Sequence, residues 1–357
     1  MNRPFTLAVV AALALQGCQD ALRPVSPRST MAVATEAAPL VPRTIAPQET
    51  DPDVDWVPPR NPNCTDPRCN HHHVWLDPSR PSNGKLFVFL PGFAPQAPRP
   101  RAHQFVQQEA ARLGYHVIGL VYQNNVGPGG CAGSPDPDCF EKVRLEIIDG
   151  VDRSQLVNVT GANSIDNRLT KLLLYLDAQF PAEGWSRFLH KGEPKWSQIA
   201  IGGHSGGAGQ AALIGKIRHV DRVVMLSGPA GESAAWVAIG ETPAAKYFEL
   251  HHVRDHFASV IRANLGALEL DRFGAPVQFE LSQPPYDGTH ILVTDLEPRG
   301  GYATPNPHNS TAVDRWTPLG LDGTPLLRDA WRYILGDHQT DVAERARGSR
   351  RGLADAP

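Results

Sequence analysis

The sequence has no excess of positive charge. It contains 34 Lys and Arg residues and 37 Asp and Glu residues, and the formal net charge is -3 at pH 7. Nucleic-acid-binding domains gain affinity from clustered cations that neutralise phosphates. The composition therefore gives no electrostatic reason to expect a nucleic-acid partner.

Long apolar runs are also missing: no stretch after residue 18 approaches the ~18 residues of a membrane-spanning helix. The early apolar segment at residues 5–15 is too short to span a bilayer and follows Arg3, as in an export signal. It ends in LQGC, at residues 15–18, which resembles the lipobox of bacterial lipoproteins. The resemblance implies cleavage before Cys18, a lipid on its sulfur, and contact with the membrane only through that lipid. The alternative is an ordinary secretory signal, and both predict export.

Cysteine is scarce, with five residues in 357. If Cys18 carries a lipid, four cysteines remain, and an even number is typical of disulfide-bonded exported proteins. The simplest connectivity joins sequence neighbours, Cys64 with Cys69 and Cys131 with Cys139, although the sequence also permits crossed pairs.

The stretch CTDPRCNHHHVW, at residues 64–75, combines two cysteines with three histidines. Zinc ligands on one segment usually follow C-x2-C or i, i+4 histidine spacing. Consecutive histidines in a strand alternate between its faces and cannot all reach one ion. We therefore expect a disulfide here rather than a metal site.

Composition divides the chain into four parts. Residues 1–17 form the signal, and residues 18–60, rich in Pro, Ala, Thr and Ser, form a flexible tether. A folded domain follows over residues 61–340, and residues 341–357, with Gly and Arg but no apolar face, form a flexible tail.

Buried-strand and helix patterns alternate through the domain. Strands are expected at residues 85–93, 115–122, 197–205, 220–228, 246–255 and 290–296. Helices are expected at residues 100–114, 164–180, 208–217, 256–268 and 325–335. This alternation predicts an α/β fold in which helices cover both faces of a mainly parallel central sheet.

Ser205 lies between an apolar strand and a helix, inside GHSGG at residues 203–207. This is G-x-S-x-G, and in a sharp strand-to-helix turn only very small residues fit two positions before and after the serine. Working residues of parallel sheets lie at the carboxyl ends of strands. Ser205 is therefore the candidate nucleophile. A phosphate-binding turn is disfavoured, because neither G-x-G-x-x-G nor a Gly-Lys-Ser/Thr ending is present.

With these features, the region from about residue 85 to residue 335 resembles the α/β-hydrolase superfamily, and within it secreted bacterial esterase- or lipase-like serine hydrolases. The resemblance implies the α/β-hydrolase fold and the chain order nucleophile, acid, histidine. The histidine acts as the base, which is needed because a serine hydroxyl is a poor nucleophile until its proton is removed.

The candidate acid is Asp255, at the end of the strand-like run YFELHHVRD. Glu232 follows the preceding strand, and Asp295 ends the next one, so both compete for the role. The alternative interpretation of Asp255 is a surface pair with Arg254 or a cap for the following helix.

The candidate base is His308, in TPNPHNSTAVDRW between the last strand and the closing helix. His290 begins a strand and would lie at the opposite edge of the sheet. His204 is expected to pack at the turn. Packing is also expected for three histidines that could alternatively orient the acid: His251, His252 and His256.

The resemblance also implies two backbone N–H donors for the oxyanion. One is Gly206, directly after the nucleophile, and the other is Phe93, with Ala94 as the alternative. Many relatives have His-Gly before this second donor, whereas this chain has Pro91-Gly92.

Together these residues predict a serine hydrolase that cleaves a small-molecule, lipid or polymer ester through an acyl-enzyme, without a cofactor. Ser205 attacks, His308 carries the proton and Asp255 orients His308. The rivals are a serine peptidase or amidase with the same triad, and a non-catalytic binding lipoprotein. A mere scaffold has no need for serine, acid and histidine together. We expect the protein to be lipid-anchored to a bacterial membrane or secreted.

Overall fold

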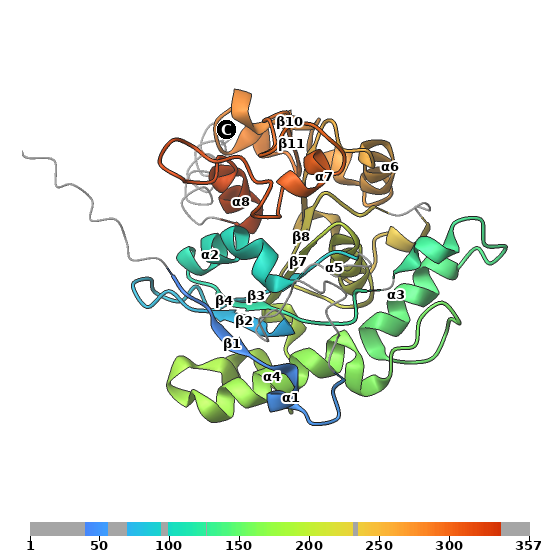
Figure 1. The fold of residues 1–357 in the computed structure, drawn as a ribbon, viewed down its shortest axis with the longest axis vertical. Coiled ribbons are helices and arrows are strands. Elements are labelled where there is room, and N and C mark those ends of the chain that lie inside the picture. The colour runs from blue at the N-terminus through green and yellow to red at the C-terminus, as the bar shows by residue number, and fades with distance from the viewer. Residues whose placement is uncertain (1–39, 56–69, 94–98, 126, 231–234, 337–357) are drawn as a thin grey trace, which may run out of the picture. The chain divides into compact units, whose positions relative to one another are not determined.

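A nine-stranded sheet lies at the centre of the fold (Figure 1). The structure is a computed structural model that describes residues 40–55, 70–93, 99–125, 127–230 and 235–336. The predicted signal with Cys18, the pair Cys64 and Cys69, and the predicted tail lie outside these residues.

All strand pairs of this sheet are parallel except the two made by β2, which runs against both of its neighbours. In sheet order the strands are β1 (Arg43–Ile45), β2 (His72–Trp75), β4 (His116–Gly119), β3 (Leu86–Leu90), β7 (Ile199–His204), β8 (Arg222–Leu226), β9 (Tyr247–His252), β11 (Ile291–Thr294) and β10 (Val277–Gln278). A separate two-stranded sheet joins β5 (Leu189–His190) to β6 (Glu193–Pro194).

Helices cover both faces of the central sheet (Figure 1). One face packs against α3 (Cys139–Asp149), α4 (Ile165–Gln179), α5 (Gly206–Ile217) and α6 (Ala258–Ala267). The other packs against α2 (Gln104–Arg112) and α8 (Arg328–Leu335). The shorter helices are α1 (Pro47–Thr50) and α7 (Asn306–Ser310). Across the described part of the chain, no helix combines the length and apolarity needed to cross a bilayer. The α/β fold predicted from the sequence, a mainly parallel central sheet with helices on both faces, is confirmed.

Strand β3 is apolar at every position because its side chains are buried on both faces of the sheet. Leu86, Val88 and Leu90 belong to the core beneath α3, α4, α5 and α6, while Phe87 and Phe89 belong to the core beneath α2 and α8. All five side chains are fully buried. A strand covered on both faces needs apolar residues at every position.

The fold begins inside the predicted tether. Strand β1 pairs with β2, Ile45 is buried, and Arg43 donates to both carboxylate oxygens of Glu183 at 3.0 and 2.7 Å. The domain boundary predicted at residue 61 is therefore wrong for residues 40–55. A three-residue edge strand is held by long-range hydrogen bonds and one ion pair, which leave no periodic apolar pattern in the sequence.

Helix α3 is a second element that the sequence pattern does not predict. Two of its buried side chains, Arg144 and Glu146, are charged. Glu146 accepts hydrogen bonds from three backbone N–H groups, those of Arg153, Ser154 and Val159, at 2.8 to 3.2 Å. Charged residues on the buried side interrupt the apolar stripe by which a helix is recognised.

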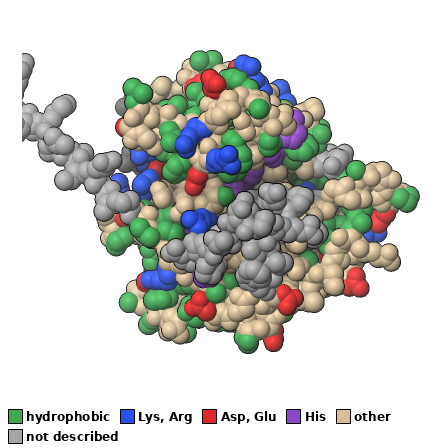
Figure 2. Space-filling view, viewed as in Figure 1, with side chains coloured by type: hydrophobic (Ala, Val, Ile, Leu, Met, Phe, Trp, Pro, Cys, Tyr) green, Lys and Arg blue, Asp and Glu red, His purple; other side chains and the backbone are tan. Residues whose placement is uncertain are grey.

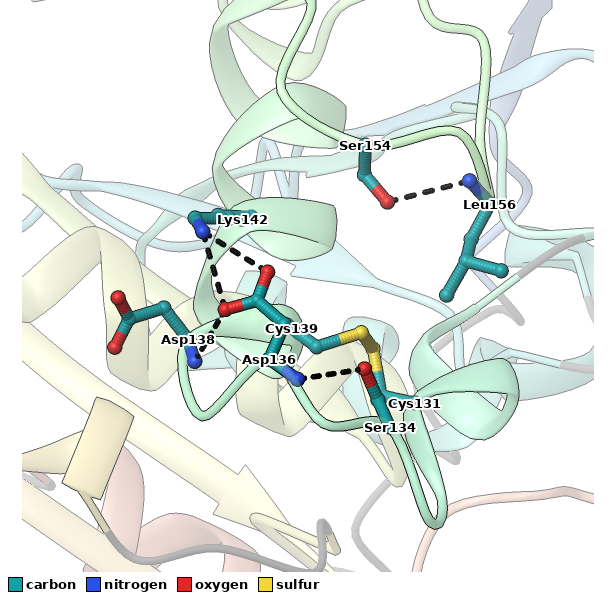
Figure 3. Close-up of a disulfide and its surroundings, with 8 residues drawn as sticks. All are labelled: Cys131, Ser134, Asp136, Asp138, Cys139, Lys142, Ser154 and Leu156. Carbon is teal, nitrogen blue, oxygen red and sulfur yellow. Dashed lines mark hydrogen bonds and ion pairs between the residues drawn. A yellow bond between two sulfur atoms is a disulfide. The ribbon is translucent and has the colours of Figure 1, made fainter.

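The loop between β4 and α3 is closed by the Cys131–Cys139 disulfide, one of the two expected local pairs (Figure 3). Within this loop Asp136 accepts two hydrogen bonds from Lys142, at 2.9 and 3.1 Å, and one from the Asp138 N–H at 3.0 Å. The disulfide and these bonds tie the loop to the first turn of α3.

We expect the variant Cys131→Ala/Cys139→Ala to lose roughly 2.5 kcal/mol of unfolding free energy, because the disulfide restricts a loop with a sequence separation of 8. Urea denaturation of the two proteins measures the difference. Non-reducing peptide mapping of the wild type is the control and should recover the linked peptides. A loss below about 0.5 kcal/mol, within the range of ordinary surface substitutions, would contradict the stabilising role.

Candidate active site

Ser205 lies at the carboxyl end of β7, in the turn into α5. Its φ of 56° and ψ of -121° lie in a region that costs a non-glycine residue on the order of 1–3 kcal/mol. The Ser205 N–H donates to the Leu226 carbonyl at 2.9 Å, and the Ser205 carbonyl accepts from the Gly209 N–H at 3.2 Å. These bonds to β8 and α5 hold the strained turn expected of GHSGG.

The two outer glycines of the motif are required because a larger residue would clash with neighbouring backbone atoms. A Cβ on Gly203 would lie 2.5 Å from the backbone of Gly207 and 2.5 Å from the Leu90 carbonyl oxygen. A Cβ on Gly207 would overlap the same oxygen. The end of β3, the end of β7 and the start of α5 therefore meet through backbone atoms alone.

The structure brings the predicted acid and the predicted base together, although they are 53 residues apart. Asp255 follows β9, His308 lies in α7, and His308 Nδ1 is 2.7 Å from Asp255 Oδ2. The other carboxylate oxygen accepts the Phe257 N–H at 2.8 Å. Both side chains are buried, with 7% of His308 and none of Asp255 exposed.

The hydrogen bond of this pair determines which ring nitrogen of His308 carries a hydrogen. Burial alone would raise the pKa of Asp255, but the hydrogen bond from His308, together with that from the Phe257 N–H, lowers that pKa below its ordinary value. An ionised carboxylate only accepts hydrogen bonds, so His308 Nδ1 carries the proton. In a neutral ring, Nε2 is then able to accept another proton.

His204 links this pair to the turn that contains the serine. Its Nε2 lies 3.1 Å from the His308 carbonyl oxygen, and the two ring centroids are 5.0 Å apart. Burial lowers the pKa of His204 well below its ordinary value, so the ring is neutral and donates this bond through Nε2. His204 therefore does more than pack: it links the His308 backbone to the residue that directly precedes Ser205.

The other candidates for acid and base have different surroundings. His290 lies just before β11, at the opposite end of the sheet, between two phenylalanine rings with centroids 4.1 and 3.9 Å away. Asp295 pairs with Arg254 at 2.7 Å, so Arg254 is not the partner of Asp255. Glu232 lies outside the described residues.

Of the three histidines predicted near the acid, only His256 has a ring nitrogen near the Asp255 carboxylate, 3.6 Å from Oδ1. His251 is buried and bonded to Glu249 at 2.8 Å, and His252 Nε2 bonds a backbone carbonyl at 3.1 Å. Histidine side chains reach the molecular surface near α6 and α7 (Figure 2).

The two residues predicted to supply the oxyanion donors, Phe93 and Gly206, are in contact through the Phe93 ring. A Cβ on Gly206 would overlap the Phe93 ring, and a Cβ on Gly92 would lie 3.0 Å from the Ser205 Cβ. Within the described residues the Phe93 N–H donates to no acceptor. The Gly206 N–H, in the first turn of α5, has no acceptor within the helix. Ala94, the alternative donor, lies outside the described residues.

Sequence reasoning misses Arg144, which lies on α3 and is fully buried. Its Nη1 donates to the Gly206 carbonyl at 3.2 Å, and its guanidinium lies over the Trp236 ring, 4.1 Å from the centroid. This contact with an aromatic face favours a buried cation. The sequence carries no signal for this role, because the helix that contains Arg144 is itself not predicted from the sequence pattern.

The histidine run at residues 71–73 has a structural role at β2. His72 is fully buried, and its Nδ1 accepts the Val121 N–H at 3.0 Å. Among the residues that the structure describes, no three His, Cys, Asp or Glu side chains are grouped to hold a metal ion.

No protein-family model matches the chain, and no curated protein matches its sequence. Among solved structures, the chain is similar to esterase B from Lactobacillus rhamnosis, with 14% identity, 86% of this chain and 89% of that one covered, and a TM-score of 0.39. It is also similar to carboxyl esterase 2 from the fungus Tuber melanosporum, with 8% identity and a TM-score of 0.35. That match covers 73% of this chain and 78% of the other. A third similar structure is the acetyl ester-xyloside bifunctional hydrolase from Caldicellulosiruptor lactoaceticus, with 14% identity and a TM-score of 0.35. That match covers 71% of this chain and 85% of the other. Likenesses this distant carry no argument about activity.

Proposed function

We propose that this chain is a serine hydrolase that cleaves carboxylic esters through an acyl-enzyme. The observation that carries the proposal is the buried Asp255–His308 hydrogen bond of 2.7 Å, tied through His204 to the strained Ser205. A strained backbone and a buried, charged hydrogen-bonded pair both cost free energy. A non-catalytic binding protein gains nothing from linking the two.

In the proposed reaction, Ser205 Oγ attacks the ester carbonyl carbon while His308 Nε2 takes the hydroxyl proton. Asp255 holds the His308 ring and stabilises the imidazolium that forms. The N–H groups of Phe93 and Gly206 donate to the oxyanion. His308 then returns the proton to the leaving alkoxide, and a water molecule repeats the sequence to release the acid.

The experiment is turnover of p-nitrophenyl acetate, butyrate and octanoate, compared with p-nitroacetanilide. We expect the esters to be hydrolysed and the anilide, with its poorer leaving group, to react much more slowly. The Ser205→Ala variant is the control for spontaneous hydrolysis. Faster reaction of the anilide would assign a peptidase or amidase instead, and no turnover of any substrate above the control would contradict a hydrolase.

A further inference from the structure

The segment that follows β3 touches the nucleophile. A Cβ on Gly92 would lie 2.9 Å from the His204 carbonyl oxygen and 3.0 Å from the Ser205 Cβ. Glycine has only a hydrogen atom at this position. The next residue, Phe93, places its ring against Gly206 and against Gly127 of the loop after β4. The peptide between Gly92 and Phe93 is thus confined beside Ser205.

Two buried side chains from the segment that follows β4 hold consecutive carbonyls of the segment after β3. The Tyr122 hydroxyl donates to the Pro91 carbonyl at 2.5 Å, and Asn124 Nδ2 donates to the Gly92 carbonyl at 2.7 Å. Tyr122 is 1% exposed and Asn124 is 4% exposed. Because both bonds are shielded from water, losing one leaves a buried carbonyl without that partner.

The Asn124 bond acts on the peptide that carries the proposed oxyanion donor. The Gly92–Phe93 bond is not among the cis peptides of the described residues, so its C=O and N–H point in opposite directions. Holding the Gly92 oxygen on Asn124 therefore also holds the direction of the Phe93 N–H. The Tyr122 bond acts one peptide earlier, on the unit that carries the Gly92 N–H.

We propose that Asn124 is a positioning residue for the oxyanion site: its amide anchors the Gly92 carbonyl and thereby aims the Phe93 N–H at the oxygen bound beside Ser205. This role rests on the proposed function. Preorganised donors stabilise the transition state more than the bound substrate. Loss of the Asn124 amide should therefore lower kcat and leave KM nearly unchanged.

The test compares Asn124→Leu with wild type on p-nitrophenyl acetate. Removal of a whole oxyanion donor costs roughly 100- to 1000-fold in kcat, and misdirecting one should cost about 10- to 100-fold, with KM within about 2-fold. The inhibition constant of a trifluoromethyl ketone, whose serine adduct bears the same oxyanion, should rise by the same factor as kcat falls.

Asn83→Leu is the matched control, because Asn83 Nδ2 also donates to a backbone carbonyl, that of Leu113 at 3.2 Å, but lies before the amino end of β3. It should leave kcat unchanged. If Asn124→Leu does not fold, Asn124→Asp keeps the size of the side chain and, when ionised, cannot donate to the Gly92 oxygen.

Unchanged kcat in the folded Asn124 variants, or a rise in KM that accounts for the whole loss, would overturn the positioning role while the hydrolase proposal stands. A wild type inert toward p-nitrophenyl esters would overturn both.

Discussion

Ser205→Ala and His308→Ala should each reduce kcat on p-nitrophenyl acetate by roughly 10⁴- to 10⁶-fold, and the double variant should be scarcely slower than either. The two side chains act as one unit, because the hydroxyl attacks only when His308 takes its proton. Steady-state kinetics of the three purified proteins measures this. Additive losses would show that the two residues do not share one proton transfer.

Two further variants complete this comparison. Asp255→Asn should also be severe, because an amide can donate to His308 Nδ1 and so favour the wrong tautomer. His290→Ala should cost little turnover, because that ring lies between two phenylalanines at the opposite end of the sheet. If His290→Ala abolishes turnover in a folded protein while His308→Ala is tolerated, the proposed base is wrong.

Gly207→Ala should lower the free energy of unfolding by about 3 kcal/mol or more, or prevent folding, because the added methyl group would overlap the Leu90 carbonyl oxygen. The clash is with backbone atoms of β3, which cannot move without disturbing the sheet. Urea denaturation, with the ester assay on the same samples, measures the effect.

Gly266→Ala, near the end of α6, is the matched control, because a Cβ there meets no atom within 4 Å. It should be neutral or stabilise the protein by up to about 1 kcal/mol, since alanine is a better helix former than glycine. A Gly207→Ala protein with wild-type stability and activity would show that the turn is looser than the structure indicates.

The features that could be predicted from the sequence are those with a local signature. β3 and β7 are continuous apolar runs, and Ser205 is flanked by glycines because backbone atoms crowd both sides of its turn. The position of Asp255 after a strand indicates the acid, and the chain order of the resemblance indicates His308. The structure adds the 2.7 Å bond that joins the two side chains.

The features that could not be predicted depend on contacts between distant segments. The Arg43–Glu183 pair spans 140 residues and keeps β1 on the sheet. The bond from His204 to the His308 carbonyl spans 104 residues. Neither contact changes the periodicity of its own segment, so no pattern in the sequence reveals it.

Labelling with a fluorophosphonate probe, followed by peptide mapping, tests the central claim most directly. We predict a single covalent adduct on Ser205, absent from Ser205→Ala and formed much more slowly in His308→Ala, because the probe reacts only with an activated serine. A wild-type protein that hydrolyses p-nitrophenyl acetate while Ser205 stays unmodified, or that carries the adduct on another residue, would contradict the account.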